Sequence, residues 1–269
     1  MSKNSLLEIQ NLSISLPDGG DRSYAVDNLN LEIIENEILC VVGESGSGKS
    51  MMARSIMGLL PRRLKITGGE IKFEDRLLNH LTPKQFQEIR GLLIAMIFQE
   101  PMSALNPLHS IGKQIEEVLL LHTSLNKTER RKRILEMLTA VHLPDPQHII
   151  QSYPHEISGG QRQRAMIAMA LILEPKILIA DEPTTALDVT TQAQILKLIR
   201  DLQREKQTGV IFITHDFGVV AEIADRIAVM KDGQLVEENE AQVILNSPQH
   251  IYTQELIRSV PDLKTPKPV

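Results

Sequence analysis

The sequence has no tryptophan, a single cysteine and only 3% aromatic residues. One thiol excludes an internal disulfide, and the position of Cys40 within the apolar run 38–42 predicts a thiol buried in a core strand. The sequence also has no excess of basic residues. It contains 29 Lys and Arg and 34 Asp and Glu, which gives a formal net charge of −5. This balance disfavours a dedicated nucleic-acid binder, so we expect no nucleic-acid partner.

Long hydrophobic runs are also absent. No uninterrupted apolar stretch approaches the roughly 20 residues that a membrane-spanning helix needs. Residues 1–5 lead directly into an alternating apolar segment and carry no signal-peptide pattern. We therefore expect a cytoplasmic protein that reaches a membrane only through partners. The 269 residues, 42% of them hydrophobic, are enough to form a sizeable core.

Strand and helix patterns alternate along most of the chain. Apolar alternation predicts strands at 7–14 and 29–33, and short apolar runs predict buried strands at 38–42, 92–98, 177–180 and 210–214. Helical spacing is found at 49–60, 160–173, 191–206 and 217–224, and a short helix begins at Thr82-Pro83. A closing hairpin turns at 231–233. The alternation predicts an α/β fold with a mainly parallel sheet and crossover helices.

The pattern changes between 104 and 157. Helical spacing occurs at 111–122 and 127–141 with no strand pattern between them, which predicts an inserted helical subdomain. The basic cluster at 130–133 falls on a face of the second helix that we expect to be solvated. Residues 264–269, with two prolines, are predicted to form a frayed tail.

The strongest local motif follows the strand at 38–42. It reads Gly43-Glu44-Ser45-Gly46-Ser47-Gly48-Lys49-Ser50 and fits the phosphate-binding pattern G-x-x-x-x-G-K-[ST]. Its glycines let backbone N–H groups close around phosphate oxygens, and the following helix adds positive potential at its N-terminus. Lys49 would reach the β- and γ-phosphates, and Ser50 would supply a hydroxyl to Mg²⁺. The alternative is a tight glycine turn with no ligand, which the strand–loop–helix context disfavours.

Two carboxylates, Asp181 and Glu182, follow the apolar run 177–180. At the carboxyl edge of a parallel sheet they would lie beside the phosphate loop. Asp181 could hold Mg²⁺, and Glu182 could take a proton from the attacking water, a contribution of about 10²–10⁴-fold. A solvated acidic pair is the alternative. His215 follows the strand at 210–214, where a histidine taken alone is more often satisfied by a backbone group.

A second candidate phosphate site is Ser158-Gly159-Gly160-Gln161, just before a predicted helix. Ser158 is a natural N-cap, and the small residues leave N–H donors uncovered at the helix N-terminus. Because the chain already has one phosphate loop, a second site suggests that it binds the nucleotide of a partner.

In this order the motifs resemble those of the ABC (ATP-binding cassette) ATPase family, over about residues 6–256. The resemblance makes 43–50 the Walker A motif, 177–182 the Walker B motif with catalytic Glu182, and 157–161 the signature, where Ile157 replaces the usual Leu. It implies a P-loop NTPase core with a mainly parallel sheet, an N-terminal antiparallel β subdomain and an inserted helical subdomain. The chain is then a single ABC ATPase domain, 1–269, with the core and β subdomain at 1–100 and 158–240, the helical subdomain at 101–157 and a C-terminal extension at 241–269.

The resemblance also assigns roles to single residues. Gln99 matches the Q-loop glutamine, which senses Mg²⁺ and water and adjoins the membrane subunit, so the implied Mg²⁺ ligands are Ser50, Gln99 and Asp181. His215 matches the switch histidine at the γ-phosphate. The remaining implied nucleotide contacts are Tyr24, which would stack on adenine, Met51 after the Walker A serine, and Asp188 of the D-loop Ala186-Leu187-Asp188.

A narrower resemblance points to the peptide/nickel uptake branch, which includes oligopeptide, dipeptide, nickel and microcin C importers. It is carried by segments 98–109, 153–156, 180–189 and 250–256. The branch usually has Pro at the position of Ile251. Many members also have a C-terminal cysteine cluster, and without one here we expect no iron–sulfur site. Peptides, metals and metal chelates all stay open as solutes.

The branch implies a peripheral ATPase subunit at the cytoplasmic face of the inner membrane. Its implied partners are two transmembrane permease subunits, a second ABC ATPase chain, identical or different, and an extracytoplasmic solute-binding protein. ATP would be sandwiched head-to-tail between Lys49 of one chain and Ser158 and Gly160 of the other. One alternative is a soluble ABC ATPase of DNA repair or translation, disfavoured by the short insertion and the single cassette. The other is a non-hydrolysing nucleotide-binding module, disfavoured by Glu182 and His215.

Overall fold

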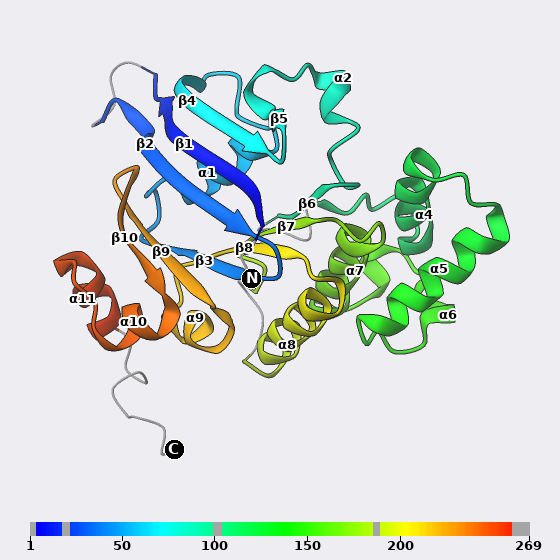
Figure 1. The fold of residues 1–269 in the computed structure, drawn as a ribbon. Helices are drawn as coiled ribbons and strands as arrows, with labels where there is room; N and C mark the ends of the chain where they lie inside the picture. Colours follow the sequence, from blue (N-terminus) through cyan, green and yellow to red (C-terminus); the bar gives the residue numbers. More distant parts are fainter. Residues whose placement is uncertain (1–3, 18–21, 99–103, 185–188, 260–269) are drawn as a thin grey trace.

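The computed structural model describes residues 4–17, 22–98, 104–184 and 189–259 (Figure 1). Its centre is a six-stranded sheet in the order β10-β9-β3-β8-β7-β6. Neighbouring strands are parallel except for β10, which pairs antiparallel with β9. The strands are β3 (Ile38–Val42), β6 (Ile94–Ile97), β7 (Ile177–Asp181), β8 (Gly209–Thr214), β9 (Arg226–Lys231) and β10 (Gln234–Glu240).

The central parallel strands are buried on both faces, which explains why they read as continuous apolar runs. Alternate residues of each strand enter different cores. In β3, Leu39 and Val41 pack with α1 (Lys49–Ile56) and the second sheet. Cys40 and Val42 pack on the other face with α7 (Gly159–Leu171), α8 (Val189–Lys206) and α9 (Phe217–Ile223). Cys40 is fully buried in this strand, as predicted, and burial raises the pKa of its thiol.

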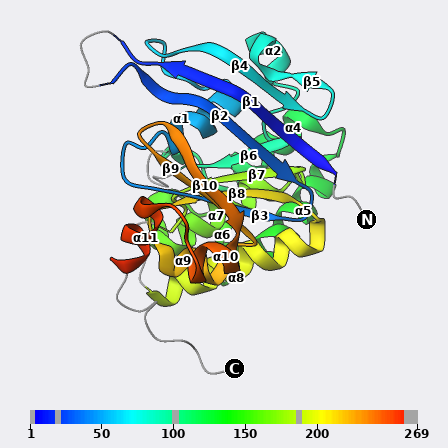
Figure 2. The same ribbon diagram turned by 60° about the vertical axis from the view of Figure 1, so that its left-hand side comes forward.

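The second sheet is antiparallel and has the strand order β2-β1-β4-β5. It contains β1 (Ser5–Ser15), β2 (Tyr24–Ile34), β4 (Lys65–Phe73) and β5 (Arg76–Leu77). It covers α1 from the side opposite the central sheet (Figures 1 and 2). The fold class expected from the sequence is therefore confirmed: an α/β core, an N-terminal antiparallel sheet and an inserted group of helices.

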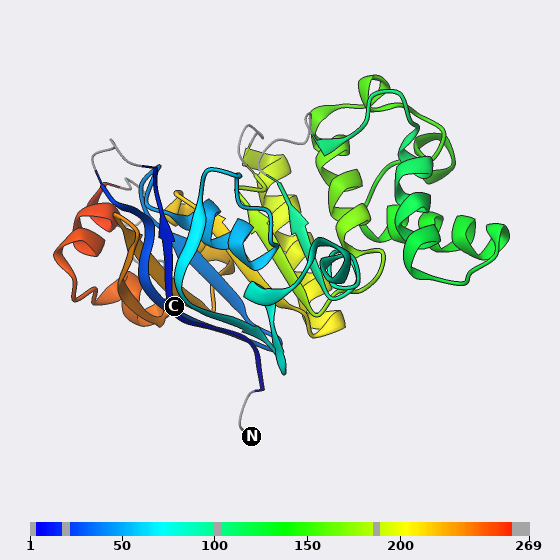
Figure 3. The same cartoon turned by 90° about the horizontal axis from the view of Figure 1, so that it is seen from above.

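Residues 104–157 form helices and, over that described segment, no strand. They include α4 (Ile111–His122), α5 (Lys127–Ala140), α6 (Pro146–Ile149) and the 3-10 turn η2 (Pro154–Glu156). Asn126 caps α5 in a reciprocal capping box with Glu129. Figure 3 shows these helices (green) at one end of the molecule, while α10 (Ala241–Asn246) and α11 (Ile251–Arg258), orange to red, lie at the opposite end.

One helix is shorter than its sequence pattern predicts. The prediction extended the first helix to residue 60, but α1 ends at Ile56. Gly58 adopts φ +60°, and the backbone N–H groups of Gly58 and Leu59 donate to the carbonyls of Ser55 and Arg54. These two hydrogen bonds form a Schellman motif, which ends a helix at a glycine in the left-handed conformation.

The other short elements are η1 (Leu78–His80) and α2 (Pro83–Phe86), and Thr82 caps α2 as predicted. Within the described ranges, no helix is both long and apolar enough to cross a bilayer.

Candidate nucleotide-binding and hydrolysis site

The five parallel strands of the central sheet, β9, β3, β8, β7 and β6, end at the same edge. In the sheet, Val42 of β3 pairs with Thr214 of β8, and Asp181 of β7 pairs with Ile213 of β8. The glycine loop, the two carboxylates and His215 therefore leave the sheet at neighbouring positions, although Ser50 is 131 positions from Asp181 and Glu182 is 33 positions from His215. The direction of parallel strands predicted that the carboxylates lie beside the glycine loop, whereas the place of His215 was expected only from the family resemblance.

The glycine loop is tightly fitted to its surroundings at two of its glycines. A Cβ atom on Gly43 would lie 2.1 Å from the carbonyl oxygen of Met230, and one on Gly48 would lie 2.4 Å from that of Ala25. Both positions have positive φ, +147° and +105°. Only glycine satisfies both requirements, so the loop keeps its backbone N–H groups close to the helix start.

Lys49 lies at the centre of this loop, with 5% of its surface exposed. Its ammonium donates to the carbonyl oxygens of Gly43 (2.7 Å) and Glu44 (2.8 Å) and to the hydroxyl of Ser47 (3.2 Å). Burial lowers the pKa of Lys49, and the nearby carboxylates of Glu182 and Asp181 partly oppose this shift. A buried ammonium group at the start of a helix can bind the negative charge of a polyphosphate.

Ser50 and Asp181 form the pair that could hold a metal ion. The Ser50 hydroxyl donates to the Asp181 carboxylate at 3.0 Å. Asp181 is 3% exposed, and burial raises its pKa, an effect that the Ser50 hydrogen bond partly offsets. Over the described residues no cluster of three or more His, Cys, Asp or Glu could hold a metal. One hydroxyl and one carboxylate fit Mg²⁺, which takes few protein ligands and binds phosphate oxygens besides.

Glu182 and His215 meet beside this pair. Nδ1 of His215 lies 3.2 Å from a carboxylate oxygen of Glu182. The Glu182 backbone adopts φ +47°, and its N–H donates to the carbonyl of Ile213 at 2.9 Å. A left-handed conformation costs a non-glycine residue roughly 1–2 kcal/mol, and such strain is concentrated at functional sites. The side chain of His215 is 61% exposed and that of Glu182 is 17% exposed, so the pair can face both a ligand and water.

The signature residues lie at the N-terminus of α7. Ser158 caps the helix: its hydroxyl accepts from the N–H of Gln161, whose side chain in turn accepts from the N–H of Ser158. A Cβ on Gly159 would meet nothing within 4 Å. Ile157 is 6% exposed and packs in the core, so Ile in place of Leu changes a packing residue.

The structure describes the surroundings of two other candidate residues. Tyr24 begins β2 and is 40% exposed, and the carbonyl of its neighbour Ala25 lies against Gly48. Tyr24 is therefore one residue away from a backbone contact with the glycine loop, and its side chain is exposed. Met51 follows Ser50 on α1 and is partly buried against the core. Gln99 and Asp188 fall outside the described residues.

Sequence reasoning missed three contacts to the glycine loop. A guanidinium N–H of Arg22 donates to the carbonyl of Gly46. The N–H of Gly233 donates to the carbonyl of Ser47 at 3.0 Å. The hydroxyl of Tyr252, 208 positions from its partner, accepts from the N–H of Glu44. The motif at 250–256 contains Tyr252, but nothing in its local pattern indicates the long-range contact.

A strand–glycine loop–helix unit, with two carboxylates and a histidine at the same sheet edge, defines a P-loop nucleotide-binding domain. The ABC transporter family matches residues 26–185, more than half of the chain, and the chain belongs to this family. It is therefore an ATP-binding cassette with ATP hydrolysis as its activity.

Curated relatives support this membership over nearly the whole chain. The chain is 50% identical to the dipeptide transport ATP-binding protein DppD of Bacillus subtilis, over 96% of this chain and 77% of DppD. It is 49% identical to the oligopeptide transport ATP-binding protein OppD of the same organism, over 97% of this chain and 73% of OppD.

Solved structures agree. The dimeric post-hydrolysis state of the cassette MJ0796, bound to ADP and phosphate, has a TM-score of 0.77 at 34% identity and covers 87% of this chain and 98% of that one. CbiO1 from Clostridium perfringens, part of an ABC transporter complex, also has a TM-score of 0.77, at 28% identity, with 91% of this chain and 93% of that one covered.

Proposed function

We propose that the chain is the ATP-hydrolysing subunit of a membrane importer for peptides or related small solutes, which include nickel and metal chelates. The hydrolytic part rests on the arrangement of Asp181, Glu182 and His215 around Lys49. The importer part is supported by the names of relatives that are about half identical over almost the whole chain.

We propose the following roles for the site residues. The glycine loop and Lys49 bind the phosphates, and Tyr24 stacks on the adenine. Ser50 and Asp181, together with Gln99, hold Mg²⁺, which supplies neutralising charge to the phosphates when bound. Glu182 takes the proton of the attacking water, and His215, 3.2 Å from that carboxylate, binds the γ-phosphate and orients the base.

The complete site is proposed to need a second cassette chain. Ser158, Gly159 and Gly160 lie at the N-terminus of α7, where open space around Gly159 leaves room for a partner's phosphate. A head-to-tail dimer would bring these residues, with Gln161 and Asp188, to the nucleotide on the partner's Walker A loop. The dimeric form of the structurally similar cassette MJ0796 supports this arrangement.

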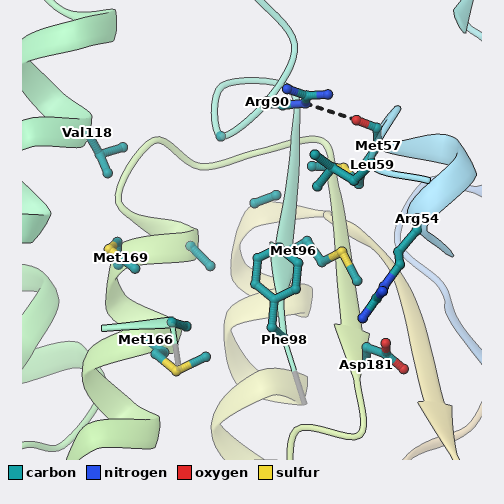
Figure 4. Close-up of a pocket in the computed structure, with 14 residues that line it drawn as sticks. Arg54, Met57, Leu59, Arg90, Met96, Phe98, Val118, Met166, Met169 and Asp181 are labelled. Atoms are coloured by element: carbon teal, nitrogen blue, oxygen red, sulfur yellow. Dashed lines mark hydrogen bonds between the residues drawn. The ribbon is translucent and has the colours of Figure 1, made fainter. Parts of the chain in front are cut away.

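A pocket of about 740 Å³ is the proposed docking surface for the permease subunits. It lies between α1 and β6 on one side and α4 and α7 on the other, with Met96, Met166 and Met169 among its apolar residues (Figure 4). Phe98, 37% exposed, lines it directly before Gln99. Asp181 lines the pocket as well, so a segment bound there would contact both the docking surface and the hydrolysis site.

This proposal places the chain peripherally at the cytoplasmic face of the inner membrane, with two permeases and an extracytoplasmic solute-binding protein as further partners. It is tested by purifying tagged Glu182→Gln protein from detergent-solubilised cells with ATP and identifying the bound proteins by mass spectrometry. We expect polytopic membrane proteins and a cassette chain. Recovery of ribosomes or DNA-repair proteins, with nothing from the membrane, would contradict the importer while leaving the ATPase intact.

A further inference from the structure

The C-terminal helix α11 contacts the glycine loop directly. Tyr252, in the second position of this helix, accepts a hydrogen bond with its hydroxyl from the backbone N–H of Glu44 at 3.0 Å. Figure 2 shows α11 beside β9 and β10, the strands that also approach the loop. Glu44 is the second residue of the Walker A motif, so a segment outside the P-loop core reaches the proposed phosphate site.

Tyr252 is held firmly in this position. It is 3% exposed, and the ammonium of Lys231, at the end of β9, lies 4.7 Å from the centre of its ring. The start of α11 is fixed to β10, because the carboxylate of Glu237 accepts from the N–H groups of Gln249 (2.7 Å) and His250 (3.1 Å). His250 caps the helix by accepting from the N–H of Tyr252 at 3.2 Å.

The peptide groups of Glu44 are fixed from two sides. Its N–H donates to Tyr252, and its carbonyl oxygen accepts from the ammonium of Lys49 at 2.8 Å. A displacement of Glu44 would therefore change the position of Lys49, the residue assigned to the β- and γ-phosphates. Without the Tyr252 hydroxyl, the partly buried N–H of Glu44 loses its partner in the fold.

We propose that Tyr252 is a positioning residue for ATP binding, and that α11 holds the Walker A loop in its binding conformation through this side chain. This inference rests on the proposed function, in which the loop at 43–50 binds the phosphates. It gives the motif at 250–256 a role in the ATPase cycle. Ile251, where the branch usually has proline, is 67% exposed and occupies the first helical position, which accepts proline.

The test compares Tyr252→Phe with the matched control Ser259→Ala. Tyr252→Phe removes one hydroxyl and keeps the ring beside Lys231. Ser259→Ala also removes one hydroxyl, but Ser259 is exposed at the C-terminal end of the same helix and donates to the carbonyl of Leu256. Titration with ATP should give a dissociation constant about tenfold higher for Tyr252→Phe, the loss expected for one hydrogen bond whose donor is left unpaired. Ser259→Ala should bind ATP like the wild type.

Amide hydrogen exchange at Glu44 provides the readout that a purely structural role would not change. In Tyr252→Phe this amide should exchange faster, while core amides of β3 keep their protection. In Ser259→Ala it should exchange as in the wild type. Unchanged ATP affinity and unchanged exchange at Glu44 would overturn the inference, as would equal losses in both variants. If the wild type itself bound no ATP, the proposed function would fail instead, and the exchange at Glu44 would still decide whether Tyr252 holds the loop.

Discussion

The substitution Gly159→Ala should affect the stability of the folded chain and the formation of the proposed dimer in opposite directions. Gly159 is the first residue of α7, and a Cβ there would meet no atom of this chain within 4 Å. The fold therefore does not require glycine at this position. If glycine is needed, the reason lies outside the chain, in the close approach of a partner's nucleotide to the helix N-terminus.

The magnitude of each effect follows from this difference. Replacing glycine by alanine in a helix stabilises the native state by about 0.5–1 kcal/mol, and a first-turn position lies at the lower end. For a chain of this length that corresponds to a rise in Tm of roughly 1–4 °C. In the head-to-tail dimer the same methyl group would meet the partner's phosphates. We expect it to weaken ATP-dependent association by at least about tenfold, or 1.4 kcal/mol.

Two measurements on Gly159→Ala test this reasoning in a Glu182→Gln background, which should bind ATP without hydrolysing it. Thermal unfolding without nucleotide should show a Tm at or above that of the parent. Sedimentation with Mg-ATP should show a higher midpoint concentration for association, of the chain with itself or with the second cassette chain recovered with it. Association at the parent's midpoint, with the Tm unchanged or raised, would refute the proposed contact at Gly159.

Two further substitutions test the stability of the chain without nucleotide or a partner. Burial raises the pKa of Asp181 above its unfolded value near 3.8, so the native state binds this proton more tightly, and stability falls as the pH rises through the native pKa. Asp181→Asn should remove this pH dependence and raise Tm at neutral pH in thermal melts without Mg²⁺, whereas a lower Tm at every pH would contradict it. Gly58→Ala would force φ +60° on alanine and place its Cβ 2.4 Å from the ring of Phe86. It should cost about 2 kcal/mol or more in urea unfolding, and a loss below 0.5 kcal/mol would argue against the strained helix end.

The chemistry of the site was predictable from the sequence because it depends on short-range patterns. The loop at 43–50 and the carboxylates at 181–182 each follow an apolar strand, and parallel strands end at a common edge. The structure adds two contacts to this prediction: the hydroxyl of Ser50 lies 3.0 Å from the carboxylate of Asp181, and Nδ1 of His215 lies 3.2 Å from that of Glu182.

Other parts depend on long-range contacts and could not be predicted. Strand β4 carries an interrupted pattern with two adjacent glycines, and it is ordered by pairing with β1, whose partner residues are 50 to 66 positions away. The early end of α1 is determined by Gly58 fitting against Phe86, a residue of another element. The contact of Tyr252 with Glu44 joins opposite ends of the chain and leaves no periodic signal.

The most direct test of the account is the release of phosphate from Mg-ATP by the purified wild type and by Glu182→Gln. Glu174→Gln is a matched control, because Glu174 forms exposed salt bridges with Arg133 and Lys206 away from the site. The account predicts a rate about 10²–10⁴-fold lower for Glu182→Gln, with ATP still bound, and an unchanged rate for Glu174→Gln. Hydrolysis by Glu182→Gln at the wild-type rate would contradict the assignment of Glu182 as the general base.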